Sequence, residues 1–241
     1  MNREYLVQSF DRFGLSLTEE QTDQFLDYAE LLVSWNQKMN LTAITEFDEI
    51  VWKHFIDSLA VYQSRNVSRE TLKQSCIDIG TGAGFPGIPI KIMNPECKMT
   101  LVDSLAKRIT FLDEVIKQCN LKKIETVHSR AEDLAQNPKY RENYHLCISR
   151  AVSNLSTLSE YCLPFIRKGG IFLSYKAGNS EGEIRDAQKA IKVFGGSMIH
   201  AEEFILKGTD LNRTLVIVKK MQNTPKKYPR KAGIPAKSPI H

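Results

Sequence analysis

The apolar residues of the chain follow a helical period before residue 75 and a strand-like pattern after it. Within the first 74 residues, one helix is indicated by a capping box at Thr18 and Gln21 and by a face of apolar residues that recur at intervals of three and four. A second helix is expected to follow Thr45. The apolar face of the first helix consists of Phe25, Tyr28, Ala29, Leu32 and Trp35. Residues 1–74 are therefore expected to form a helical extension.

From residue 75, short runs rich in Ile, Val and Leu alternate with amphipathic stretches of helical length. The runs lie at 76–79, 99–102, 124–127, 145–149 and 171–175, and the helical stretches at 86–93, 105–119, 131–137, 154–167 and 181–194. This alternation predicts parallel strands joined by crossover helices. Strand candidates 198–206 and 213–219 follow without a helix between them, which predicts an antiparallel hairpin. We therefore expect an α/β fold, with a Rossmann-like, mostly parallel seven-stranded sheet over residues 75–220.

The segment 221–241 has a different composition. It contains four of the nine prolines, so we expect neither helix nor central strand there. Seven basic residues and no acid fall within 219–241, whereas the other 218 residues carry 26 basic and 28 acidic side chains. Tyr228 lies among Lys226, Lys227, Arg230 and Lys231, a combination typical of contacts with RNA phosphates. A solubilising extension is the alternative.

Composition narrows the class of protein. Apolar residues make up 42% and charged residues 25%, as in ordinary globular proteins, and no apolar run approaches the length of a membrane span. The start MNREYLVQSFDR lacks the apolar core of a secretory leader, so we expect a cytoplasmic protein without a membrane contact. Five widely spaced cysteines without metal-ligand spacing indicate buried apolar residues and no metal site.

The glycine-rich stretch DIGTGAGFPG after the first strand admits two interpretations. Gly82 to Gly87 fits the dinucleotide fingerprint G-x-G-x-x-G, which would make the chain an NAD-type oxidoreductase. The other register, Asp78-x-Gly80-x-Gly82-x-Gly84, resembles the first motif of class I methyltransferases that use S-adenosylmethionine. A pyrophosphate requires free backbone amides. Asp78 instead favours a cation, such as the methionine end of S-adenosylmethionine with its ammonium and sulfonium groups. The second register is favoured, and a turn that binds nothing is the remaining alternative.

Acids after the next two strands extend this site. Asp103 ends the second strand, where a carboxylate can accept hydrogen bonds from ribose hydroxyls, although it could instead cap the next helix. Glu132 follows the third strand, where an acid can accept from the adenine amino group or favour a helix start. Both acids indicate an adenosine ligand without deciding between the two cofactors.

The acceptor can be narrowed by the motifs that are missing. The fourth strand leads into Arg150-Ala151-Val152 rather than the tetrad of adenine-N6 enzymes, and no cysteine has the context of a cytosine-C5 nucleophile. A ring nitrogen with a free lone pair, such as N7 of guanine, needs no catalytic base. Arg150, at the end of the fourth strand, is a candidate for orienting the base, or forms a surface ion pair. His54 is expected in the core of the helical extension.

Several motifs together resemble one family over residues 5–240. They are Trp35-Asn36-x-x-x-Asn40-Leu41-Thr42, His54-x-x-Asp57-Ser58, DIGTGAGFPGIPIKI, Val102-Asp103-Ser104, Arg130-Ala131-Glu132, Ser149-Arg150-Ala151-Val152 and Lys227-Tyr228-Pro229-Arg230-Lys231. The chain resembles the bacterial 16S ribosomal RNA guanine-N7 methyltransferases of the small subunit, also called glucose-inhibited division protein B. The resemblance implies that Gly80, Phe85, Ala131, Glu132 and Arg150 contact S-adenosylmethionine and that Asp103 holds its ribose.

The resemblance also implies a reaction, which is methylation of one guanine in 16S ribosomal RNA, free or within a 30S particle. We expect a monomer. A non-catalytic RNA-binding module is the alternative from another functional class, and it would bind RNA without incorporating methyl groups.

Overall fold

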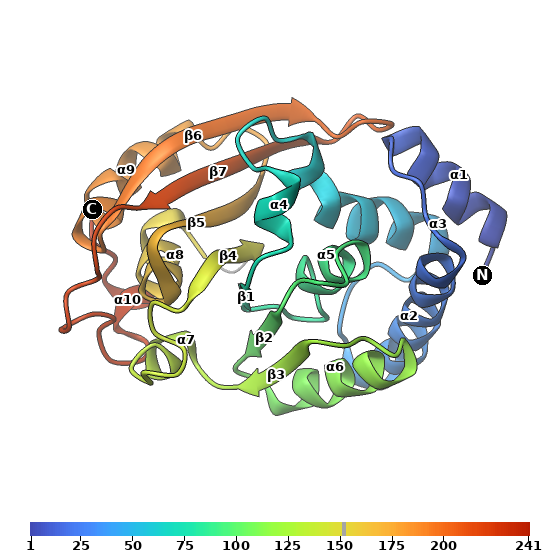
Figure 1. Ribbon diagram of the computed structural model, residues 1–241, viewed down its shortest axis with the longest axis horizontal. Helices are drawn as coiled ribbons and strands as arrows, with labels where there is room; N and C mark the ends of the chain where they lie inside the picture. Colours follow the sequence, from blue (N-terminus) through green and yellow to red (C-terminus); the bar gives the residue numbers. More distant parts are fainter. Residues whose placement is uncertain (151–152) are drawn as a thin grey trace.

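The computed structural model describes residues 1–150 and 153–241, and a seven-stranded sheet lies at its centre (Figure 1). The strands are ordered β3-β2-β1-β4-β5-β7-β6, with β7 antiparallel to both of its neighbours and the other pairs parallel. Their bounds are β1 Cys76–Ile79, β2 Met99–Asp103, β3 Ile124–His128, β4 Tyr144–Arg150, β5 Ile166–Ala177, β6 Gly196–Ile205 and β7 Asn212–Lys220. The predicted sheet and its closing hairpin are confirmed. Ala151 and Val152, which end the motif after β4, lie outside the described residues.

Helices cover both faces of this sheet. On one face lie α1 (Arg3–Phe13), α2 (Glu19–Met39), α3 (Phe47–Ile50), the π-helical η1 (Val51–Ile56), the 3-10 helix η2 (Leu59–Gln63), α4 (Arg69–Leu72), α5 (Gly87–Met93) and α6 (Ala106–Gln118). On the other lie α7 (Ala131–Leu134), α8 (Leu155–Cys162), the 3-10 helix η3 (Leu163–Phe165) and α9 (Glu181–Val193), with α10 (Ile234–Lys237) against α8. The capping box of Thr18 and Gln21 starts α2 as predicted.

Strand residues alternate between two hydrophobic cores. In β4, Leu146 and Ile148 join the core of the first face, whereas Cys147 joins the second. The helices of residues 1–74 bury Phe10, Phe25 and their apolar neighbours in the first core, so this segment packs directly on the sheet. The division of the chain into 1–74, 75–220 and 221–241 stays a prediction about its organisation.

Two expectations about local structure are wrong. The helix predicted over 154–167 ends at Cys162, because Ile166 pairs with Tyr144 and starts the long strand β5. Beyond Lys220, where prolines were expected to prevent a helix, α10 forms with Pro235 in its first turn. Proline is compatible with that position because its missing amide would have no partner within the helix and its φ is already helical.

Candidate active site

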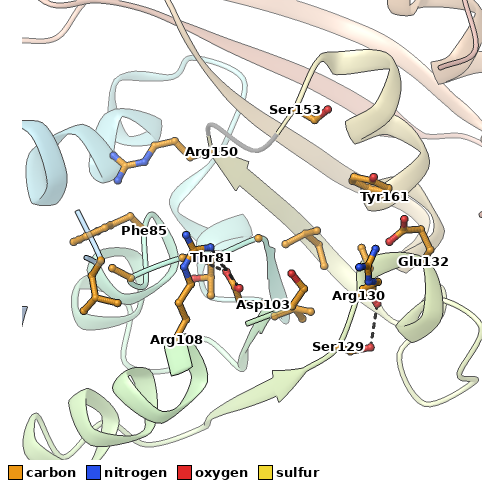
Figure 2. Close-up of a pocket in the computed structure, with 18 of the residues that line it drawn as sticks. Thr81, Phe85, Asp103, Arg108, Ser129, Arg130, Glu132, Arg150, Ser153 and Tyr161 are labelled. Atoms are coloured by element: carbon orange, nitrogen blue, oxygen red, sulfur yellow. Dashed lines mark hydrogen bonds and ion pairs between the residues drawn. The ribbon is translucent and has the colours of Figure 1, made fainter. Parts of the chain in front are cut away.

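A cavity of about 530 Å³ opens at the carboxyl ends of β1, β2 and β4, where open α/β sheets bind ligands (Figure 2). Its size is that of a pocket for a nucleoside-sized ligand. Of the predicted donor-binding residues, those that line the cavity are Gly80, Gly82, Phe85, Asp103, Ala131, Glu132 and Arg150. Within the part of the chain that the structure describes, Asp78 and Gly84 are not among the residues that line it.

Asp78 lies beneath the glycine loop rather than facing the cavity. Its carboxylate is fully buried, and Oδ2 accepts hydrogen bonds from Thr81 Oγ1 at 2.7 Å and the Gly87 amide at 2.9 Å. Oδ1 has no partner among residues 1–150 and 153–241, and burial raises the pKa of this acid to about 7. Its carboxylate therefore supports the loop from below, and a contact of Asp78 with a cationic ligand stays a prediction.

Most amides of the loop already donate hydrogen bonds within the protein. Gly87, the first residue of α5, donates to Asp78, so a carboxylate of the chain takes the position that a pyrophosphate would need. Six further amides donate to backbone carbonyls or to Asp103, and they are those of Gly80, Thr81, Gly82, Gly84, Phe85 and Ile88. Among the described residues, the amide of Ala83, which lines the cavity, has no such acceptor. The dinucleotide interpretation thus loses most of the amide donors that a pyrophosphate needs, whereas a cationic ligand end requires no such donors.

The glycines of the loop serve two different purposes. A Cβ at Gly82 would meet no atom within 4 Å, and this residue lines the cavity with φ at +62°. A Cβ at Gly84 would lie 2.6 Å from Ile88 and 2.7 Å from the Tyr28 hydroxyl, with φ at +101°. Gly82 therefore leaves room for a ligand, whereas Gly84, predicted to do the same, leaves room for the protein's own side chains.

Asp103 ends β2 on the floor of the cavity and is 3% exposed. Its carboxylate accepts from the amides of Gly82 at 3.0 Å and Leu105 at 2.9 Å, and pairs with Arg108 Nη1 at 3.1 Å (Figure 2). The alternative that Asp103 caps the next helix is wrong, because α6 has Leu105 as its N-cap and no side-chain cap hydrogen bond. Arg108 Nη1 also lies 3.5 Å from Oδ1, so the carboxylate accepts four contacts from three donors.

Glu132 and Tyr161 lie together across the cavity from Phe85 and Arg150 (Figure 2). Glu132 lies in the first turn of α7, is buried, and accepts from the Gly233 amide at 2.9 Å. Burial raises the pKa of Tyr161 to about 12, and the nearby Glu132 charge adds to this shift. This end of the cavity therefore presents a carboxylate and a protonated phenol.

The opposite end is built around Phe85. The ring of His54, in η1, stacks on Phe85 with centroids 4.4 Å apart, and the Arg150 guanidinium lies 5.2 Å from the Phe85 centroid. His54 Nε2 is 2.8 Å from Thr42 Oγ1, while its buried Nδ1 has no partner in the described chain. Burial, followed by the charge of Arg150, lowers the pKa of His54 to about 4. His54 is therefore neutral at physiological pH.

Arg150 is oriented by an acid from the helical extension. Asp57 Oδ2 lies 2.9 Å from Arg150 Nη1, and Asp57 Oδ1 lies 2.5 Å from Arg213 Nε. This pairing replaces the surface ion pair considered for Arg150, because the side chains of Asp57, Arg150 and Arg213 are 9%, 14% and 18% exposed. One carboxylate thus fixes two guanidinium groups.

Sequence reasoning missed several cavity residues. His54 was assigned to the core, although His54 and Asp57 are three apart on one helical segment, a signal that both could face one site. No local pattern identified the others, since they come from separate elements, and they include Leu41, Thr42, Ser153, Tyr161 and Ala236.

The predicted RNA-binding cations divide into two groups. Lys226, Lys227 and Lys231 are exposed. Arg230 instead donates to Glu160 with Nε at 3.0 Å and Nη2 at 2.6 Å, and Glu160 is 1% exposed. Arg230 therefore fastens the C-terminal segment to α8, and its contact with RNA stays a prediction.

The fold and the cavity define a class I methyltransferase that depends on S-adenosylmethionine, with a glycine loop after β1 and acids after β2 and β3. Two solved structures share the fold at low sequence identity. A fibrillarin/Nop5p complex aligns with TM-score 0.52 and 12% identity over 70% of this chain and 82% of that one. A geranyl diphosphate methyltransferase in complex with its methyl donor aligns with TM-score 0.51 and 11% identity over 68% and 84%.

The family model for rRNA small subunit methyltransferase G matches residues 21–213. The ribosomal RNA small subunit methyltransferase G of Acetivibrio thermocellus is 47% identical over 99% of this chain and 96% of its own. That of Lactobacillus acidophilus is 46% identical over the full length of both. The chain belongs to the rRNA small subunit methyltransferase G family. In the described residues, no helix is long and apolar enough to cross a bilayer, and no three metal-ligating side chains form a cluster.

Proposed function

We propose that this protein transfers the methyl group of S-adenosylmethionine to N7 of one guanine in 16S ribosomal RNA. The observation that carries the choice of acceptor is the lack of a strong base among the described residues of the cavity. His54 has a pKa of about 4, Asp103 is paired with Arg108, and Glu132 accepts from Gly233. Such a site suits an acceptor that has no proton to remove.

The residues that fit the methyl donor fall into three groups along the cavity. Ala131, Glu132 and Tyr161 would hold the adenine, and Asp103 would accept from the ribose. The turn at Gly80 and Gly82 would receive the methionine end, because its amides are already bonded and the space beside Gly82 is open. When bound, the donor supplies an electrophilic methyl group on a sulfonium.

The remaining end of the cavity would receive the guanine. Arg150 is held by Asp57 and can donate to the O6 edge of the base, next to N7. His54 offers a buried ring nitrogen that has no partner within the described residues, and Phe85 offers an aromatic face beside it. In the reaction, the N7 lone pair forms a bond to the methyl carbon as the carbon–sulfur bond breaks, and its electrons stay on sulfur. Positioning in line is then the main task of the protein.

The three exposed lysines of the C-terminal segment, Lys226, Lys227 and Lys231, would contact RNA phosphates outside the cavity. We further propose that the chain acts as a monomer in the cytoplasm, on 16S RNA within a 30S particle or on free RNA. The test is transfer of labelled methyl groups to 16S RNA from cells that lack this protein, offered in both forms. The proposal fails if donor binding is intact and neither form accepts label.

A further inference from the structure

We infer that residues 233–236 form a wall of the methyl-donor cavity at its adenine end, and that the Gly233 amide is the positioning group for Glu132. This inference rests on the proposed function, because it assigns these residues to the S-adenosylmethionine site. Two contacts at the cavity carry it. Gly233 N donates to Glu132 Oε1 at 2.9 Å, and Ala236 is among the residues that line the cavity.

The C-terminal segment is fastened along its length, so these two contacts are part of a built structure. After β7, buried Lys220 donates to the Leu163 carbonyl at 2.6 Å, and Arg141 donates to the carbonyls of Thr224 at 2.9 Å and Tyr228 at 3.0 Å. The Tyr228 ring then packs edge-on against Phe194, 5.0 Å between centroids. The chain therefore arrives at α8 along a defined path.

The last part of that path is fixed by a buried acid. Glu160 in α8 accepts from the Arg230 amide at 2.8 Å and from its guanidinium at two positions, and Arg230 Nη1 donates to the Ser238 carbonyl at 2.9 Å. Between these anchors lies α10, whose buried Pro235 has its carbonyl 3.2 Å from Thr157 Oγ1. Figure 1 shows α10 beside α7 and α8, the two helices that carry Glu132 and Tyr161.

This arrangement explains why Glu132 can act as a fixed acceptor. An isolated carboxylate in a first helical turn rotates freely, whereas the Gly233 amide holds one of its oxygens and leaves the other for a ligand donor. Gly233 has φ at +85°, a conformation that suits glycine and directs the chain into α10. The segment predicted as an RNA-binding tail thus has a second role, which lies in the donor site.

The two roles separate at residue 231. A chain that ends at Lys231 keeps the Arg230–Glu160 pair and the three exposed lysines, but lacks Gly233 and Ala236. We expect its dissociation constant for S-adenosylmethionine, measured by calorimetry, to rise about tenfold while RNA affinity changes less than threefold. The matched control is the double variant Lys226→Ala with Lys227→Ala, which should bind RNA more weakly and the donor as the wild type does. Wild-type donor affinity in the truncated chain would overturn the inference.

A measurement on the intact wild-type chain removes any dependence on how the truncated chain folds. Saturation with S-adenosylmethionine should slow amide hydrogen exchange across residues 233–237 at least fivefold relative to the free protein. Unchanged exchange there, with slower exchange in the loop at Gly80 and Gly82, would refute the wall while keeping the donor site. A wild-type chain that binds no donor would refute the proposed function itself.

Discussion

Replacing Gly82 by alanine tests whether the space beside the glycine loop belongs to the ligand. The chain offers a matched control at Gly178. Both glycines have φ at +62°, and at both a Cβ would meet no atom within 4 Å, but only Gly82 of the two lines the main cavity. The strain of a left-handed alanine should therefore be the same in Gly82→Ala and Gly178→Ala. The two variants should differ only in their affinity for the ligand.

Two effects are expected, a loss of Tm in both variants and a weaker Kd for the donor in Gly82→Ala. A left-handed conformation costs a non-glycine residue about 1–2 kcal/mol. For a chain of 241 residues, that cost lowers Tm by roughly 2–8 °C in each variant. A methyl group in the ligand space should displace the donor enough to lose one good hydrogen bond, about 1.4 kcal/mol, or tenfold in Kd.

Scanning calorimetry and titration calorimetry with S-adenosylmethionine measure the two quantities separately. We expect equal losses of Tm and a tenfold weaker Kd in Gly82→Ala alone. Equal donor affinity in both variants would refute the assignment of Gly82 to the donor site. Failure of Gly82→Ala alone to fold would show that the loop has a packing constraint at this position that the open space does not reveal.

The remaining predictions concern charge. Asp78 has its pKa raised from 3.8 to about 7, so the native chain holds this proton more tightly than the unfolded chain between those values, and stability should fall as pH rises through that window. Asp78→Asn should lack this pH dependence. Between pH 4 and pH 8, the free energy of unfolding measured by urea denaturation should fall by about 4 kcal/mol more in the wild type than in the variant. An equal change in both proteins would contradict the prediction. Asp57→Asn should cost roughly 3 kcal/mol, because it leaves two half-buried guanidinium groups without a counter-charge, and a loss below about 1 kcal/mol would show that they find other partners. The double variant Lys226→Ala with Lys227→Ala should reduce the slope of log RNA affinity against log salt by about 1.5, and an unchanged slope would remove these lysines from the RNA interface.

Sequence patterns predicted the sheet because each strand is a short apolar run between amphipathic stretches, a signal that lies within a few residues. They also placed Asp103, at the end of β2, and Glu132, in the helix that follows β3, beside the cavity, because each position depends only on the strand before it. Their contacts with a ligand stay predictions. Other parts of the site depended on contacts that the sequence does not show. Gly84 has the expected spacing, yet Tyr28, which lies far earlier in the chain, occupies the space beside it.

The position of the C-terminal segment also depends on contacts between residues that are far apart in the sequence. Its prolines and lysines describe an extended basic tail, and nothing near Arg230 in the sequence indicates Glu160, which lies 70 residues earlier. The pairing depends on α8 lying beside the end of the chain. His54 likewise acquires its low pKa from burial and from Arg150, which no helical period around residue 54 could show.

The most direct test of the central claim is the position and chemistry of the methyl group. Purified protein would be incubated with radiolabelled S-adenosylmethionine and 16S RNA or 30S particles from cells that lack this protein, and the RNA cleaved selectively at N7-methylguanine. The account predicts one labelled guanine, at N7, and about tenfold less of that label in Gly82→Ala but not in Gly178→Ala at limiting donor. Label on a different atom or spread over many guanines would contradict the proposed acceptor.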